Sequence, residues 1–311
     1  MLSSIRNSRV LVTGGTGFIG SYLVKRLLSE GADLHVLRRK TSGAFRLDGL
    51  ESRVHSHTVD YRDLAGLTST VRRINPQKIF HLAAHTDVGR TMDNCSRSLE
   101  SIIISTLNLI RALEGVDYEI FVNTGTCEEY GDNPAPFRES QIPNPVSPYS
   151  AAKVSTTMYC RMFHKTMGLP IVTLRPFLTY GPGQEPRRFI PQAIKAALNG
   201  EEFKMTQGEQ TREFNYVEDI VEGYLLAATT PEAIGRIINI GNGKEYQLRE
   251  LVEKIFLLAG AETRPVFGGL PYRPGETWHF YCDNRLAREI LGWKPKYSLD
   301  EGLKLTIEAM R

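Results

Sequence analysis

The chain has 311 residues, a net charge of +3 and a hydrophobic content of 41%. Its length allows one large domain or two smaller ones, and its low charge without a long basic block argues against a nucleic-acid partner. No apolar stretch reaches about 18 residues and the opening residues lack the apolar core of a signal peptide, so we expect a cytoplasmic protein with no membrane partner.

The first predicted elements are a strand, a turn and a helix. An apolar run predicts the strand over 9–13, and apolar residues at helical spacing predict the helix over 18–30. Between them, Gly14, Gly17 and Gly20 are spaced G-x-x-G-x-x-G. Glycines there let pyrophosphate oxygens approach the N–H groups that begin the helix, so the turn predicts a dinucleotide site. A simple tight loop is the alternative.

The second predicted strand, 33–38, runs into Arg38, Arg39 and Lys40. NAD enzymes usually carry a carboxylate at this point, which binds the adenosine ribose and repels a 2′-phosphate. Cations favour a 2′-phosphate through charge-assisted contacts, so we predict NADP, with NAD as the alternative. A solvated basic turn would also explain the pattern.

Strands continue to alternate with helices over the first two thirds of the chain, which predicts a doubly wound parallel sheet in an α/β fold. The predicted strands are 9–13, 33–38, 54–59, 78–83, 118–124 and 170–175, and the predicted helices 18–30, 63–74, 97–114 and 149–167. From about residue 176, prolines and glycines interrupt the alternation of strands and helices, and helical patterns follow at 248–260 and 299–310. We therefore expect a Rossmann dinucleotide domain over 1–175 and a smaller C-terminal lobe over 176–311, with later segments crossing back.

Tyr149 and Lys153 lie four residues apart, on one face of a helix that Ser147 and Pro148 can start. A phenol with a reference pKa of about 10 is a poor acid or base at neutral pH, and a neighbouring ammonium favours the phenolate. The pair therefore predicts proton transfer beside a carbon that gives or takes a hydride. The alternative is that both side chains are solvent-exposed surface residues without a catalytic role.

Four cysteines without C-x-x-C spacing argue against a metal site and against a disulfide framework.

Together these features resemble the extended short-chain dehydrogenases that act on nucleotide sugars, over essentially the whole chain. The resemblance rests on the segment 13–20, on 81–84, on Tyr149 with Lys153, on 175–176 before 180–182, and on 212–219. It implies a nucleotide-sugar-binding C-terminal lobe, a nucleotide-diphosphate sugar as partner and a homodimer built on 97–114 and 149–167. The family often has Asn where this chain has Ile102.

The same resemblance assigns residues to the site. Thr126 matches the hydroxyl that bonds the reacting sugar oxygen, beside Tyr149 and Lys153, and Phe189 belongs to the segment that covers the base. Arg212 and Arg273 match arginines that clamp the diphosphate. The implied cofactor residues are Gly14, Thr16, Gly17, Phe18, Ile19, Gly20, Arg38, Arg39, Asp60, Leu82, Ala83, Ala84, Tyr149 and Lys153. For Asp60, turn capping is the alternative.

Three reactions share this apparatus. Sugar 4,6-dehydratases resemble Thr-Asp-Glu where this chain has Thr126, Cys127 and Glu128, so the usual acid is missing and Glu128 is either a base or a polar group at a strand end. Epimerases and dehydratases recycle a held cofactor, commonly NAD, whereas a net reductase commonly uses NADP. The basic cluster therefore favours a 4-ketoreductase of a nucleotide-activated 4-keto-6-deoxy-hexose. The alternatives are a C4 epimerase or 4,6-dehydratase, and a nonenzymatic NADP sensor.

Overall fold

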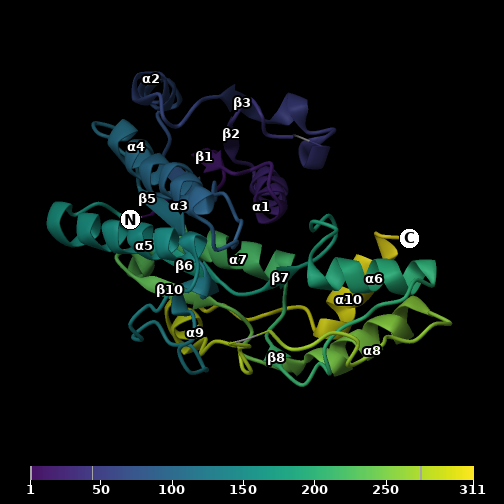
Figure 1. Cartoon of the computed structure of the whole chain (residues 1–311). Helices are drawn as coiled ribbons and strands as arrows, with labels where there is room; N and C mark the ends of the chain where they lie inside the picture. The colour runs from purple at the N-terminus through teal and green to yellow at the C-terminus, as the bar shows by residue number, and fades with distance from the viewer. Residues whose placement is uncertain (1, 44, 274) are drawn as a thin grey trace.

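The computed structural model describes residues 2–43, 45–273 and 275–311 (Figure 1). A parallel sheet of seven strands lies at its centre, in the order β10-β6-β5-β4-β1-β2-β3. Its strands are β1 (Arg9–Thr13), β2 (Asp33–Arg38), β3 (His55–Thr58), β4 (Lys78–His81), β5 (Ile120–Thr124), β6 (Ile171–Pro176) and β10 (Ile237–Ile240). The predicted parallel α/β sheet is thereby confirmed.

Helices cover both faces of the sheet. They are α1 (Phe18–Ser29), α2 (Leu64–Ile74), α3 (Met92–Ser98), α4 (Ser105–Ala112), α5 (Pro148–Met167), α6 (Phe189–Asn199), α7 (Val217–Ala227), α8 (Leu248–Ala259), α9 (Arg285–Leu291) and α10 (Leu299–Glu308). Val10 and Val12 pack in one apolar cluster with α1 and α7, whereas Leu11 packs in another with α2 and α4. Strand β1 is therefore buried on both faces, as its continuous apolar run predicts.

The strand order reverses between β1 and β4, and ligands of open parallel sheets bind at the carboxyl ends of the strands at such a point. The glycine turn lies there, between β1 and α1. Gly14 has a φ of 71°, and a Cβ at Gly20 would overlap the carbonyl oxygen of Gly14. Larger residues at these two positions would therefore distort the turn.

The part of the chain after β6 adds short strand pairs and a second apolar core. β7 (Thr179–Tyr180) pairs with β9 (Asn215–Tyr216), and β8 (Thr211–Arg212) pairs with β11 (Tyr246–Gln247). Helices α6, α8 and α10 share a core, while β10 joins the central sheet beside β6. The predicted division of the chain at residue 175 stays a prediction.

The predicted helix over 97–114 is longer and less regular than expected. It begins at Met92 as α3, continues through a π-helical segment at Leu99–Ile104, and ends as α4. Ile102 lies in the π-helical segment and is buried. Among the described residues, no helix is long and apolar enough to cross a bilayer.

Candidate active site

A cleft of about 1410 Å³ opens at the carboxyl edge of the sheet. Every residue predicted to bind the cofactor lines it, from the glycine turn to Tyr149 and Lys153. The predicted catalytic residues Thr126 and Glu128 line it as well. One cavity therefore brings together side chains from distant parts of the sequence, although their roles stay predictions.

Tyr149 and Lys153 reach the cleft from the first two turns of α5. Ser147 caps this helix by accepting a hydrogen bond from the Ser150 N–H, and Pro148 occupies the first helical position. The Lys153 ammonium donates a hydrogen bond of 2.6 Å to the carbonyl oxygen of Thr124, at the end of β5. This contact fixes the lysine between helix and sheet, directly beside the cleft.

Burial shifts the pKa of both groups. It lowers the pKa of Lys153 to about 8, against the opposing effect of Glu129. It also raises the pKa of Tyr149, although a hydrogen bond with Thr126 acts in the other direction. In this structure desolvation is the largest influence on the pKa of Tyr149 and favours the neutral phenol. The expectation that the Lys153 ammonium favours the phenolate stays a prediction. A neutral phenol is poised to donate a proton.

Thr126 precedes a short 3₁₀ helix, Cys127–Tyr130, and its side chain accepts a hydrogen bond from the Glu128 N–H at 3.3 Å. The backbone N–H of Thr126 donates to the carboxylate of Glu129 at 2.9 Å. These contacts hold the threonine at the end of β5, where its hydroxyl lines the cleft beside Tyr149.

Glu128 and Cys127 both line the cleft. Burial raises the pKa of the Glu128 carboxyl, opposed by the positive charges of Arg212 and Arg188. Burial also raises the pKa of the Cys127 thiol, so Cys127 remains a neutral thiol at neutral pH. Desolvation therefore favours the neutral form of both groups, and the carboxyl is the stronger acid of the two.

The basic cluster at the end of β2 also faces the cleft. Arg38, Arg39 and Lys40 all line it, and the Arg38 Nε is buried without a hydrogen-bond partner. Asp60 lines the same region, but its carboxylate is engaged by Arg62 at 2.8 Å, which lowers the pKa of Asp60 to about 2. The end of β2 therefore presents unneutralised positive charge to the cleft.

The predicted substrate residues divide into two groups. Phe189, at the start of α6, lines the cleft. Arg212 and Arg273 are not among the lining residues. The Arg212 guanidinium is held by Glu276 at 2.7 Å and by the carbonyl oxygen of Thr277, and Arg273 is exposed. Their assignment to the diphosphate stays a prediction.

Sequence reasoning missed the support beneath the site. Glu129 and Arg175 form an ion pair of 2.7 Å with 0% and 1% of their side chains exposed, and Tyr224 donates a hydrogen bond of 2.9 Å to the Thr124 hydroxyl. A signal for this pair exists, since Arg175 is the one charged residue of the fully buried strand β6. Nothing in the sequence near Thr124 points to Tyr224.

Comparison with known proteins decides the family. The family model described as GDP-mannose 4,6 dehydratase matches residues 11–306. The chain belongs to the extended short-chain dehydrogenase/reductase family of nucleotide-sugar epimerases and dehydratases.

Individual members of this family match along nearly their whole length. The UDP-glucose 4-epimerase of Mycolicibacterium smegmatis is 35% identical over 97% of this chain and 98% of its own. The structure of the Thermotoga maritima UDP-glucose 4-epimerase with UDP-glucose matches with a TM-score of 0.89 and 32% identity, over 97% of this chain and 98% of that chain. A dTDP-glucose 4,6-dehydratase double mutant from Streptomyces venezuelae, with NAD bound, matches with a TM-score of 0.85 and 29% identity, over 97% and 96%.

Proposed function

We propose that this protein oxidises and reduces C4 of a nucleotide-activated hexose and recycles its nicotinamide cofactor, as a C4 epimerase or a 4,6-dehydratase. The observation that carries the proposal is the meeting of Thr126, Tyr149 and Lys153 in one cleft with the glycine turn. The T. maritima and S. venezuelae relatives, with UDP-glucose and NAD respectively, support a nucleotide sugar and a nicotinamide dinucleotide as ligands.

The cleft residues fit such a cofactor. Gly14 in the turn and Gly20 in the first turn of α1 leave no room for side chains, and the free N–H groups that begin α1 suit a pyrophosphate. The bound cofactor supplies the hydride acceptor and donor. Tyr149 transfers the proton of the C4 hydroxyl, Thr126 orients that oxygen, and Lys153 holds its positive charge close to the phenol. Lys153 is expected to lower the cost of the phenolate once a ligand fills the cleft.

Glu128 distinguishes the two reactions. A dehydratase needs an acid or base to remove water across C5 and C6, and the raised pKa of this half-buried carboxyl suits that task. If this protein is a dehydratase, its Glu128→Gln variant should no longer form the 4-keto-6-deoxy product but should still oxidise C4. If it is an epimerase, the turnover of the Glu128→Gln variant should stay within a few-fold of that of the parent.

A 4-ketoreductase is the second candidate, and the cluster of Arg38, Arg39 and Lys40 at the cleft favours it. These cations suit the 2′-phosphate of NADP, the cofactor that a net reductase exchanges at each turnover. Incubation with UDP-, dTDP- and GDP-activated sugars separates the candidates. Conversion without net use of cofactor supports recycling. Oxidation of one NADPH for each 4-keto sugar reduced supports the reductase.

We also infer a homodimer through α5 and the π-helical segment. Leu99, Ile104, Met158, Tyr159 and Met162 on these elements are 36–52% exposed. Apolar side chains gathered on adjoining helices suit an interface between two copies. A Met162→Lys variant should turn a dimer into a monomer in light scattering after size exclusion. If the Met162→Lys variant and the parent have the same molar mass in this measurement, the proposed interface is contradicted.

A further inference from the structure

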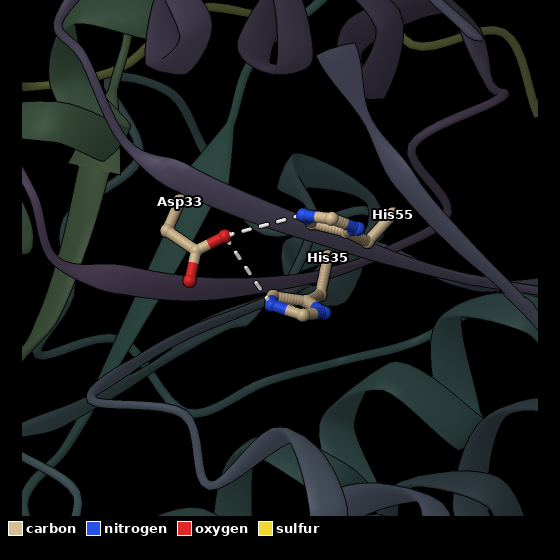
Figure 2. Close-up of side chains that lie close together, drawn as sticks. All are labelled: Asp33, His35 and His55. Atoms are coloured by element: carbon tan, nitrogen blue, oxygen red, sulfur yellow. Dashed lines mark ion pairs between the residues drawn. The ribbon is translucent and has the colours of Figure 1, made fainter. Parts of the chain in front are cut away.

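Outside the cleft, one group of side chains has the composition of a metal site. Asp33 and His35 lie on β2, and His55 lies opposite His35 on β3. One ligand atom from each of the three lies within 4.8 Å of the others. Figure 2 shows the Asp33 carboxylate pointing at a ring nitrogen of both histidines.

We propose that Asp33, His35 and His55 bind a divalent transition-metal ion of the zinc class. Two imidazoles and a carboxylate form a donor set that suits zinc, and three protein ligands leave a coordination position for water. The Oδ1 of Asp33 lies 3.5 Å from the Nε2 of His35 and 3.6 Å from the Nε2 of His55. Donors that share one tetrahedral zinc ion stand about 3.3–3.5 Å apart, so the spacing to His35 falls in this range and the spacing to His55 exceeds it by only about 0.1 Å.

A second layer of contacts supports this arrangement. The Nδ1 of His35 lies 3.0 Å from the Nε2 of His57, so His35 can donate its Nδ1 hydrogen while its Nε2 faces the metal. The Oδ2 of Asp33 lies 3.8 Å from Arg9, which leaves Oδ1 for the ion. The rings of His35 and His55 stack at 4.8 Å, so His55 must tilt to aim its lone pair, and its 66% exposure permits that movement.

The position of the site suggests what the ion does. β3 is the edge strand of the central sheet, has only four residues and pairs with β2 alone. An ion held by both strands would clamp that edge. Arg38 ends β2 and Asp60 follows β3, and both line the cofactor cleft. The proposed metal site lies near the start of β2 and β3, whereas Arg38 and Asp60 lie at or just after the other ends of these strands.

Zinc binding by the full chain tests the proposal without cofactor or substrate, so its outcome is independent of the proposed function. Calorimetric titration of EDTA-treated protein with ZnCl₂ should give one tight site per chain, and Co²⁺ should give the visible absorption of a tetrahedral complex. His55→Ala and Asp33→Asn should each weaken the Kd at least tenfold, and His57→Phe by about 10–100-fold.

Two control variants define specificity. His279→Ala removes another exposed histidine beside a carboxylate, that of Glu245 at 2.9 Å, and Cys95→Ser removes an exposed thiol. Both should bind zinc as the parent chain does. Because His55 is exposed, its replacement should not prevent folding. A Kd above about 1 mM, or one that His55→Ala leaves unchanged, would overturn the proposal.

Discussion

The carboxylate of Glu129 joins the catalytic loop to the central sheet through Arg175. One oxygen accepts a hydrogen bond from the Thr126 N–H at 2.9 Å, and the other accepts one from Arg175 at 2.7 Å. The first oxygen also accepts from the Thr157 hydroxyl on α5, at 3.1 Å. Glu129 therefore links the loop that carries Thr126, the helix that carries Lys153, and β6, which carries Arg175. Glu129 itself is not among the residues that line the cleft.

Breaking this link should destabilise the fold. Glu129→Gln leaves the Arg175 charge buried without its partner, which costs about 3–5 kcal/mol. The matched control is Glu202→Gln, which breaks the Lys204–Glu202 pair of 2.9 Å, whose side chains are 52% and 57% exposed. That change should cost about 0–1 kcal/mol. If urea unfolding shows that Glu129→Gln and Glu202→Gln lose the same free energy of unfolding, the role given to Glu129 is contradicted.

Tyr149→Phe should remove proton transfer and leave the cofactor site in place. General acid and base catalysis by a positioned side chain contributes about 10²–10⁴-fold, so kcat should fall by that factor. The Kd for the cofactor, measured by fluorescence, should change little. Tyr159→Phe changes a tyrosine on the same helix that is 41% exposed and should keep normal turnover. A Tyr149→Phe enzyme with turnover within tenfold of the parent would refute this assignment.

Lys153 should leave a signature in the dependence of stability on pH. Its pKa is lowered by burial from 10.5 to about 8, so between these values the unfolded chain binds more protons than the folded chain. Stability from this group therefore rises with pH, by about 1 kcal/mol per pH unit within that window. Relative to Lys153→Met, the cofactor-free parent should gain stability from pH 8 to pH 10. If the free energy of unfolding changes with pH in the same way for the parent and for Lys153→Met, Lys153 is not desolvated in the folded chain.

The basic cluster should set the choice between NADP and NAD. Replacing Arg39 by Ala removes a charge from the cleft, and charge-assisted hydrogen bonds are worth about 1.5–3 kcal/mol, so the Kd for NADP should rise by about 10–100-fold. The Kd for NAD should stay the same. Arg53→Ala, which removes an exposed cation away from the cleft lining, is the control. If both dinucleotides lose affinity equally, Arg39 does not recognise the 2′-phosphate.

Local pattern was enough to predict β1, because a parallel strand buried on both faces is a continuous apolar run. The predicted strand over 33–38 matches β2, and that over 9–13 matches β1. The predicted helix over 149–167 differs from α5 by one residue, since Ser147 and Pro148 mark its start. The fold class follows from these elements and the glycine turn.

Other features depend on tertiary contacts that no local pattern contains. The π-helical segment at Leu99–Ile104 lies within a continuous helical pattern that does not reveal its altered hydrogen bonds. The two-residue strands after β6 are too short to show a periodicity. The site shows the same division. Thr126, Tyr149 and Lys153 could be predicted, whereas the pairing of Arg212 with Glu276 spans 64 residues and could not. Nor does the spacing of Asp33, His35 and His55 predict their cluster, which depends on the register of β2 and β3.

The most direct test of redox chemistry at C4 is the absorbance at 340 nm when cofactor-loaded enzyme meets a panel of UDP-, dTDP- and GDP-hexoses in a stopped-flow mixer. With its substrate, the enzyme should show a transient rise in reduced cofactor, slowed by deuterium at C4 and absent from Tyr149→Phe. If a nucleotide sugar is converted with no such transient and no isotope effect at C4, the account is contradicted.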